Sequence, residues 1–198
     1  MTFEVEGQLL HAHRIVLLCS RASEVFRAML RTPMRETRTP HATIVVEDVS
    51  YEVFKLLVAY LYTGEAEVPP HLASEVLLAC ERWMCYPLQL ECAHLMVQSL
   101  CAETLWETLS VSTALQLPPP PIDALSAESQ EPTDGPADVL RDAAVVFLCE
   151  SVDLPSLVGA SEFAAFSEEL VPRIHEVLHA RLHATRAAAA AMGKLHAK

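Results

Sequence analysis

The chain has 198 residues, of which 52% are hydrophobic and 6% aromatic, and its formal net charge is −12 at pH 7. This length suits one domain followed by a smaller one. The composition favours a largely helical core of Leu, Val and Ala. Because phosphate binding needs clustered Lys and Arg, the acidic balance argues against a general nucleic-acid surface. The segment from Arg173 onward differs, since it has five basic residues and one acidic residue.

The six cysteines show no Cys-x-x-Cys pairing and mostly fall in apolar helical stretches. We interpret them as reduced, buried thiols of an intracellular protein rather than as a disulfide or zinc framework. No apolar run approaches the ~18–20 residues of a membrane span, and no secretory signal precedes the first predicted strand. We therefore expect a cytoplasmic or nuclear protein without a membrane partner.

The first thirty residues predict a strand and two short helices. Apolar residues alternate at Phe3, Val5 and Leu9, as in a half-buried strand. The almost wholly apolar run at 15–20 predicts a buried short helix or turn. Ser23 is a good N-cap for a second helix, whose apolar face consists of Val25, Phe26, Met29 and Leu30.

A further strand and a long helix follow. Ile44 and Val46 point to one side of the strand, and Ser50 is the predicted N-cap of an amphipathic helix that ends at Gly64. We expect Tyr62 at the surface, because a tyrosine can present an apolar ring and a polar tip to a partner. The rest of the apolar stripe belongs to the core: Val53, Phe54, Leu57, Val58 and Leu61.

These elements, in this order, resemble the BTB/POZ domain over roughly the first hundred residues. The resemblance implies an α+β, mostly helical fold with a small three- to four-stranded sheet and helical hairpins. It also implies a non-enzymatic protein-interaction module. The matching segments are Phe3–Gly7, Ala12–Arg14, Leu17, Val25–Met29, Met34–Glu36, Ile44 with Val46, Asp48–Val49, and Val53–Phe54 through Tyr60–Gly64.

The resemblance further implies a partner, because many BTB proteins join a target to a cullin-3 ubiquitin ligase. Cullin-binding relatives carry a hydrophobic-x-Glu signature in the loop before the second predicted strand, and Met34 and Glu36 match it. Tyr62 corresponds to the cullin edge. Met34 would fill an apolar slot and Glu36 would make a charge-assisted contact. Alternatively, Met34 folds back onto the Met29 face.

The sequence departs from the family at two places. BTB domains commonly begin with an Asp and a helix that is swapped across a homodimer interface, and neither precedes Phe3. We therefore expect an N-terminally incomplete BTB domain or dimerisation through a smaller surface, with Arg14 lacking the Asp of the family's charged pocket. Two extra residues between His13 and Phe26 predict a bulge at residues 20–23.

The BTB-like region closes with a predicted helical hairpin. A short strand is expected at Ala66–Val68, and then a helix follows the two prolines at 69 and 70. Pro87 suits the first turn of the next helix. Trp83 and Met84, at the join, are interpreted as packing residues. We place the BTB/POZ domain at residues 1–101.

The remaining chain resembles, more loosely, the all-α BACK region that follows BTB in many adaptors. A first helix is predicted at 102–117, and a Pro-rich acidic linker at 118–136. Helices resume at 137–185, with a turn near residues 153–155. The Ala-rich basic tail at 186–198 is expected to fray.

Two histidine sets raise the question of a metal. His11 and His13 have no Cys or carboxylate at ligand spacing, so we interpret them as packed under the first helix and hydrogen-bonded to backbone. His175, His179 and His183 recur every fourth residue, which spreads the outer two too far apart for one ion. We expect a solvated face there, and no metal or other cofactor.

No motif for catalysis is present. The sequence lacks a nucleophile–base signature, a phosphate-binding glycine loop and a paired-carboxylate motif, so we do not expect an enzyme. The leading hypothesis is an adaptor that bridges a cullin-3-type scaffold and an unidentified protein substrate. The alternatives are the BTB oligomerisation module of a transcriptional regulator, or a structural homo-oligomer. A homodimer would be weakened by the missing N-terminal helix.

Overall fold

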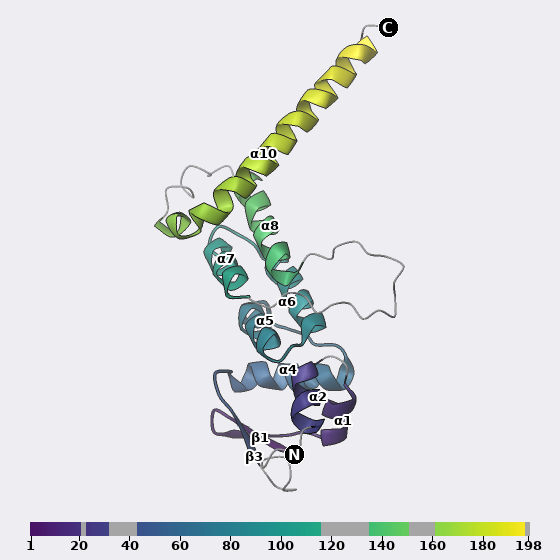
Figure 1. Cartoon of the computed structure of the whole chain (residues 1–198), viewed down its shortest axis with the longest axis vertical. Coiled ribbons are helices and arrows are strands. Elements are labelled where there is room, and N and C mark those ends of the chain that lie inside the picture. The colour runs from purple at the N-terminus through teal and green to yellow at the C-terminus, as the bar shows by residue number, and fades with distance from the viewer. Residues whose placement is uncertain (21–22, 32–42, 116–134, 151–160, 197–198) are drawn as a thin grey trace.

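The computed structural model describes residues 1–20, 23–31, 43–115, 135–150 and 161–196. The molecule is elongated, with the sheet at one end and the last helix projecting from the other (Figure 1). Its elements in chain order are β1 (Thr2–Val5), β2 (Gln8–His11), α1 (Arg14–Cys19), α2 (Glu24–Arg31), β3 (Thr43–Val46), α4 (Tyr51–Thr63), the 3₁₀ helix η1 (Pro70–Leu72), α5 (Ala73–Arg82), α6 (Tyr86–Gln98), α7 (Leu105–Ala114), α8 (Pro136–Glu150) and α10 (Ser161–His196).

The sheet has three strands in the order β2-β1-β3. β1 is antiparallel to β2 and parallel to β3, so Phe3 lies opposite both Leu10 and Ile44. The alternating pattern predicted one strand here, whereas the structure forms a hairpin. Its two connecting residues, Glu6 and Gly7, have φ of 50° and 74°. Such a turn needs positive φ at both positions, which glycine adopts at little cost.

The strand predicted at Ala66–Val68 is wrong, because no strand forms there. Val68 is nevertheless buried and Glu67 exposed. The alternation therefore reflects packing of Val68 against the core rather than pairing with another strand.

Helix α1 forms as predicted, but it is not wholly buried. Only Leu17 is buried, whereas Ile15 is 64% exposed and Cys19 is exposed. A six-residue helix turns less than two full turns, so it can direct only one side toward the core. The apolar composition of residues 15–20 therefore overstated their burial.

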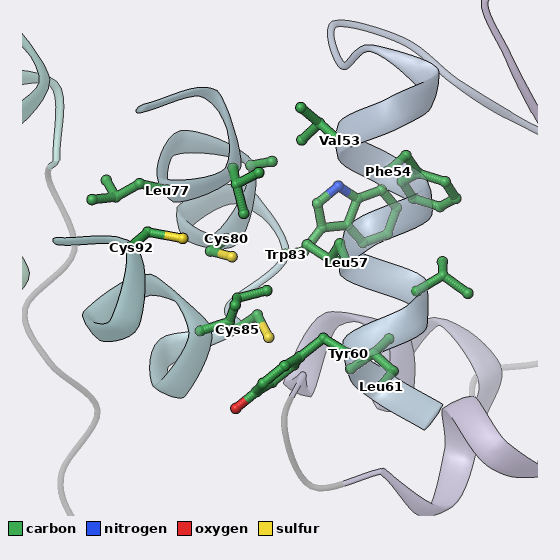
Figure 2. Close-up of a cluster of buried hydrophobic side chains, with 14 of the residues drawn as sticks. Val53, Phe54, Leu57, Tyr60, Leu61, Leu77, Cys80, Trp83, Cys85 and Cys92 are labelled. Carbon is green, nitrogen blue, oxygen red and sulfur yellow. The ribbon is translucent and has the colours of Figure 1, made fainter. Parts of the chain in front are cut away.

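Helix α4 is the centre of the larger core. Both predicted ends are confirmed: Ser50 Oγ accepts a hydrogen bond from the Val53 N–H at 3.4 Å, and Gly64 has a φ of 77°. All five residues of the predicted apolar stripe are buried. Figure 2 shows this stripe facing the α5–α6 hairpin across Trp83, whose indole ring packs 5.4 Å from the Phe54 ring, centroid to centroid.

Trp83 joins the hairpin to the rest of this core. It stacks on Phe26 with ring centroids 4.5 Å apart. Ser23 accepts a hydrogen bond from the Phe26 N–H at 3.4 Å, as its predicted capping role requires, and donates its hydroxyl to the Trp83 carbonyl. The packing role of Trp83 is confirmed, whereas Met84 is 47% exposed.

The cysteines are free thiols, as predicted, but their surroundings differ. Cys80, Cys85 and Cys92 are buried between α5 and α6, and Cys19 is exposed. Burial raises the pKa of Cys92 to about 12, with the Glu91 charge adding to it. The Cys80 thiol donates to Cys85, which raises the pKa of Cys80 and lowers that of Cys85. The three buried thiols therefore pack as apolar groups.

The second core lies among α7, α8 and α10. Helix α8 packs against α6, α7 and α10. It begins at Pro136, one residue earlier than predicted, whereas the linker at 118–134 and the turn at 153–155 lie outside the described residues. The buried residues of this cluster are Leu105, Leu109, Ala144, Val145, Leu148 and Leu170.

Helix α10 differs most from its prediction. It is one helix of 36 residues with Pro172 inside it, and it continues through the Ala-rich segment to His196. The expected fraying beyond residue 186 is therefore not observed. High helix propensity of alanine agrees with this extension. Among the described residues, no helix is both long and apolar enough to serve as a membrane span.

Candidate partner-binding surface

Tyr62 lies in the last turn of α4 and is 41% exposed, so its predicted surface position is confirmed. Its hydroxyl oxygen accepts a hydrogen bond from the His13 backbone N–H at 2.6 Å. The same oxygen lies 3.0 Å from His13 Nδ1. Because the oxygen is already an acceptor, its own hydrogen goes to Nδ1, which assigns the proton of a neutral His13 to Nε2.

This pair of contacts fixes the direction of the Tyr62 ring. His13 is the residue just before α1, and its ring centroid is 6.1 Å from that of Tyr62. Tyr62 thereby ties the end of α4 to the start of α1, 49 residues away in sequence. The interpretation of His13 as packed under the helix is wrong, because its side chain is exposed and contacts Tyr62.

Arg14 extends the connection to α2. Its guanidinium Nη2 donates to the backbone oxygen of Leu30 at 2.7 Å, in the last turn of α2. The series Tyr62, His13, Arg14 and Leu30 therefore links three helix ends at one corner of the molecule. We call this the Tyr62 corner. It also includes the exposed Ile15 in the first turn of α1.

Of the three predicted partner-binding residues, the structure describes only Tyr62. Met34 and Glu36 lie outside the described residues, as do Arg21 and Ala22 of the predicted bulge. Helix α2 ends at Arg31, three residues before Met34 in sequence. Three residues span about 10 Å at most, which limits how far Met34 can be from the end of α2.

The Tyr62 corner is suited to binding rather than catalysis. It offers an exposed phenol ring, an imidazole and an exposed Ile15 side chain. In the described part of the chain, no three His, Cys, Asp or Glu side chains are grouped so that they could hold a metal ion. His11 is separated from His13 by its partner, because His11 Nδ1 bonds Thr2 Oγ1 at 3.1 Å.

The three histidines of α10 are exposed, which agrees with the expected solvated face. Their rings follow one another along the helix, with centroids 6.0 Å apart for His175 and His179 and 4.5 Å apart for His179 and His183. This spacing brings neighbours together as i, i+4 pairs.

Sequence reasoning did not identify His13 and Arg14 as the supports of Tyr62. Ala12, His13 and Arg14 matched the family pattern, but their contacts join residues 16 and 49 positions apart. Such pairings are set by the tertiary packing of α1 against α2 and α4. Local periodicity carries no signal for them.

A family model, that of the BTB/POZ domain, matches residues 1–100. This match covers half of the chain and coincides with the sheet, the α1–α2 hairpin, α4 and the α5–α6 hairpin. The chain belongs to the BTB/POZ domain family. BTB/POZ domains are protein-interaction modules that generally have no enzymatic activity, so the chain is an interaction protein of this class.

Curated relatives combine such a domain with repeats. Armadillo BTB Arabidopsis Protein 1 from Arabidopsis thaliana is 24% identical over 178 residues, which cover 90% of this chain and 21% of the relative. ARM repeat protein interacting with ABF2, from the same plant, is 28% identical over 177 residues, or 89% of this chain and 21% of the relative. Human Kelch repeat and BTB domain-containing protein 4 is 30% identical over 110 residues, or 54% and 20%.

The chain therefore spans about a fifth of the length of these relatives. The two plant matches also extend well beyond residue 100, since each covers about nine tenths of the chain. The helical region after the BTB/POZ domain thus shares in the similarity.

Proposed function

We propose that this chain is the adaptor segment that binds a cullin-3-type scaffold and holds a protein substrate beside it. The observation that carries the proposal is the Tyr62 corner. An exposed tyrosine is fixed there by two contacts to His13, and Arg14 ties the same corner to the end of α2. Residues 32–42, which contain the Met34 and Glu36 signature, begin directly after α2.

The proposed mechanism is proximity. One surface, built from Met34, Glu36 and Tyr62, holds the scaffold, and another surface holds the substrate. Tethering both to one chain raises the effective concentration of the substrate near the ubiquitin-loading enzyme. Such an activity needs no catalytic group on this chain, and it would be exercised in the cytoplasm or the nucleus.

The helices after residue 101 would act as a BACK-like spacer. Helix α8 packs on α6 of the BTB/POZ domain and on α7, so the second core is attached directly to the first. Helix α10 then projects away from both (Figure 1). We propose that this region, at 102–117 and 137–185 around the linker at 118–136, sets the angle of whatever the chain carries.

A titration against the purified N-terminal domain of cullin-3 tests the scaffold contact. The folded chain should bind with micromolar affinity, and the double variant Met34→Ala/Glu36→Ala should bind at least about tenfold more weakly, which corresponds to ~1.4 kcal/mol. Glu52→Ala is the matched control, because Glu52 is an exposed acidic residue on α4 outside the proposed contact. Binding that the double variant leaves unchanged would refute this assignment of the surface.

A second candidate is the oligomerisation module of a transcriptional regulator, or a structural homo-oligomer. It is favoured by Leu9, which is 56% exposed on β2, an edge strand of the described sheet. Exposed apolar edge strands tend to pair with other chains. Sedimentation at micromolar concentration should show a dimer that Leu9→Lys disrupts, and a monomer would refute self-association.

A further inference from the structure

A second surface, away from the Tyr62 corner, has the features of a peptide-binding groove. It is an open groove of about 690 Å³ between β3, the segment that leads into α4, and α5. Apolar side chains form its floor, and two of them, Val45 and Leu78, are 62% and 38% exposed. Exposed apolar residues that line one hollow are typical of an interaction site.

The rim of the groove is acidic. Four carboxylates line it, and Arg82 is the one basic side chain among its described lining residues. Arg82 is already engaged, since its Nη1 donates to the Glu47 backbone oxygen at 2.8 Å and lies 3.4 Å from Asp48 Oδ2. The rim therefore complements a cationic partner. Its carboxylates belong to Glu6, Glu47, Asp48 and Glu75.

Trp83 provides an independent sign of a missing partner. Its side chain lines the groove and is 92% buried, yet its indole N–H has no hydrogen-bond acceptor among the described residues. Figure 2 shows the indole nitrogen on the side of the ring toward Val53, which also lines the groove. A buried donor without an acceptor costs about 1–3 kcal/mol, which an acceptor from a bound chain would recover.

The strand beside the groove can also accept an extended chain. Within the described sheet β3 pairs only with β1, so β3 is an edge strand. Val45 faces outward from it, whereas Val46 faces the core. An added strand would hydrogen-bond to this edge and place every second side chain over the groove.

We propose that this groove binds an extended peptide segment of another protein that alternates basic and apolar residues. The basic side chains pair with the acidic rim, the apolar ones cover Val45 and Leu78, and a backbone carbonyl accepts the Trp83 N–H. The groove is at the start of α4 and Tyr62 is at its end. Nine helical residues separate Val53 from Tyr62, about 14 Å along the axis, so the two surfaces can be occupied independently.

The test uses the full chain and a fluorescein-labelled peptide of alternating lysine and valine, with a glutamate–valine peptide for comparison. Fluorescence anisotropy should show saturable binding of the lysine peptide only. Val45→Lys and Glu47→Lys should each weaken it at least about tenfold. Both positions are exposed, so the variants should keep the wild-type circular dichroism. Glu67→Lys is the control, because it makes the same charge change at an exposed residue outside the groove.

A second reading reports on Trp83 itself. The chain has two tryptophans, so Trp106→Phe leaves Trp83 as the sole indole emitter. Its emission should shift when the lysine peptide binds. Absence of binding, equal affinity for both peptides, or unchanged affinity of Val45→Lys and Glu47→Lys would overturn the proposal. Self-association that Val45→Lys abolishes, without peptide binding, would do the same and identify a second copy as the occupant. Failure to bind cullin-3 would leave this result untouched.

Discussion

The two cores of the molecule differ in how they are built. The first surrounds α4 and joins a sheet, two helical hairpins and a cluster of four aromatic rings, Phe3, Phe26, Phe54 and Trp83. The second has six buried residues in the described chain and comes from α7, α8 and α10. Leu140 of α8 and Val111 of α7 belong to the first core. The smaller region is therefore an extension that relies on the BTB/POZ domain for support.

Phe54→Ala should have the largest effect on stability. Phe54 is fully buried and contacts three aromatic rings, so truncation removes apolar burial and leaves a cavity. We expect a loss of about 3–5 kcal/mol in the free energy of unfolding, measured by chemical denaturation. The neighbouring Lys55→Ala, at an exposed position, should change it by less than about 0.5 kcal/mol. A loss below about 1 kcal/mol for Phe54→Ala would show that this core is not rigidly packed.

Leu148→Ala should act mainly on the second core. Leu148 is fully buried there, and we expect a loss of ~2–3 kcal/mol, at the lower end for such truncations. Hydrogen exchange should accelerate in α7, α8 and α10 while α4 stays protected. Val146→Ala, at a 39% exposed position on the same helix, is the control. Equal acceleration in α4 would mean that the two cores unfold as one unit.

Alkaline pH should destabilise the first core through Tyr60. Burial, with a smaller contribution from the Glu91 charge, raises the pKa of Tyr60 from 10.0 to about 12. A raised pKa means that the fold favours the neutral phenol, so this contribution is fully present below pH 10 and is lost as the pH rises toward 12. Spectroscopic titration should show Tyr60 ionising after the exposed tyrosine Tyr62. Tyr60→Phe should remove the late step, and its persistence would contradict the assignment.

Arg173→Ala should have the smallest effect. Arg173 joins α10 to α8 through Asp142, at 2.7 Å, and Asp138, at 3.5 Å. These groups are largely solvent-exposed, and such ion pairs contribute below about 1 kcal/mol, less at high salt. Thermal melts at low and high salt should converge for the wild type and the variant. A loss above about 2 kcal/mol would indicate that this contact holds the second core in place.

The sequence was most informative where local chemistry determines structure. Ser50 and Gly64 set the ends of α4, and the spacing of apolar residues identified its buried face. It was least informative where an apolar run is short. Residues 15–20 suggested burial although Ile15 is exposed, and residues 66–68 suggested a strand although none forms.

For the candidate site, the family resemblance selected Tyr62, but the residues that hold it were not predictable. The contact from Tyr62 to His13 arises only when α4 packs against α1. The acidic groove has the same origin, because β3 and α5 are distant in sequence and meet through the core. Sequence patterns describe one element at a time, whereas both surfaces lie between elements.

The most direct test of the proposed scaffold contact is a calorimetric titration of the cullin-3 N-terminal domain into the wild-type chain and into Tyr62→Ala. Tyr62 is exposed, so the variant should fold, and circular dichroism checks this. We predict micromolar binding by the wild type and at least about tenfold weaker binding by Tyr62→Ala. No binding by the folded wild-type chain, or equal binding by both, would contradict the account.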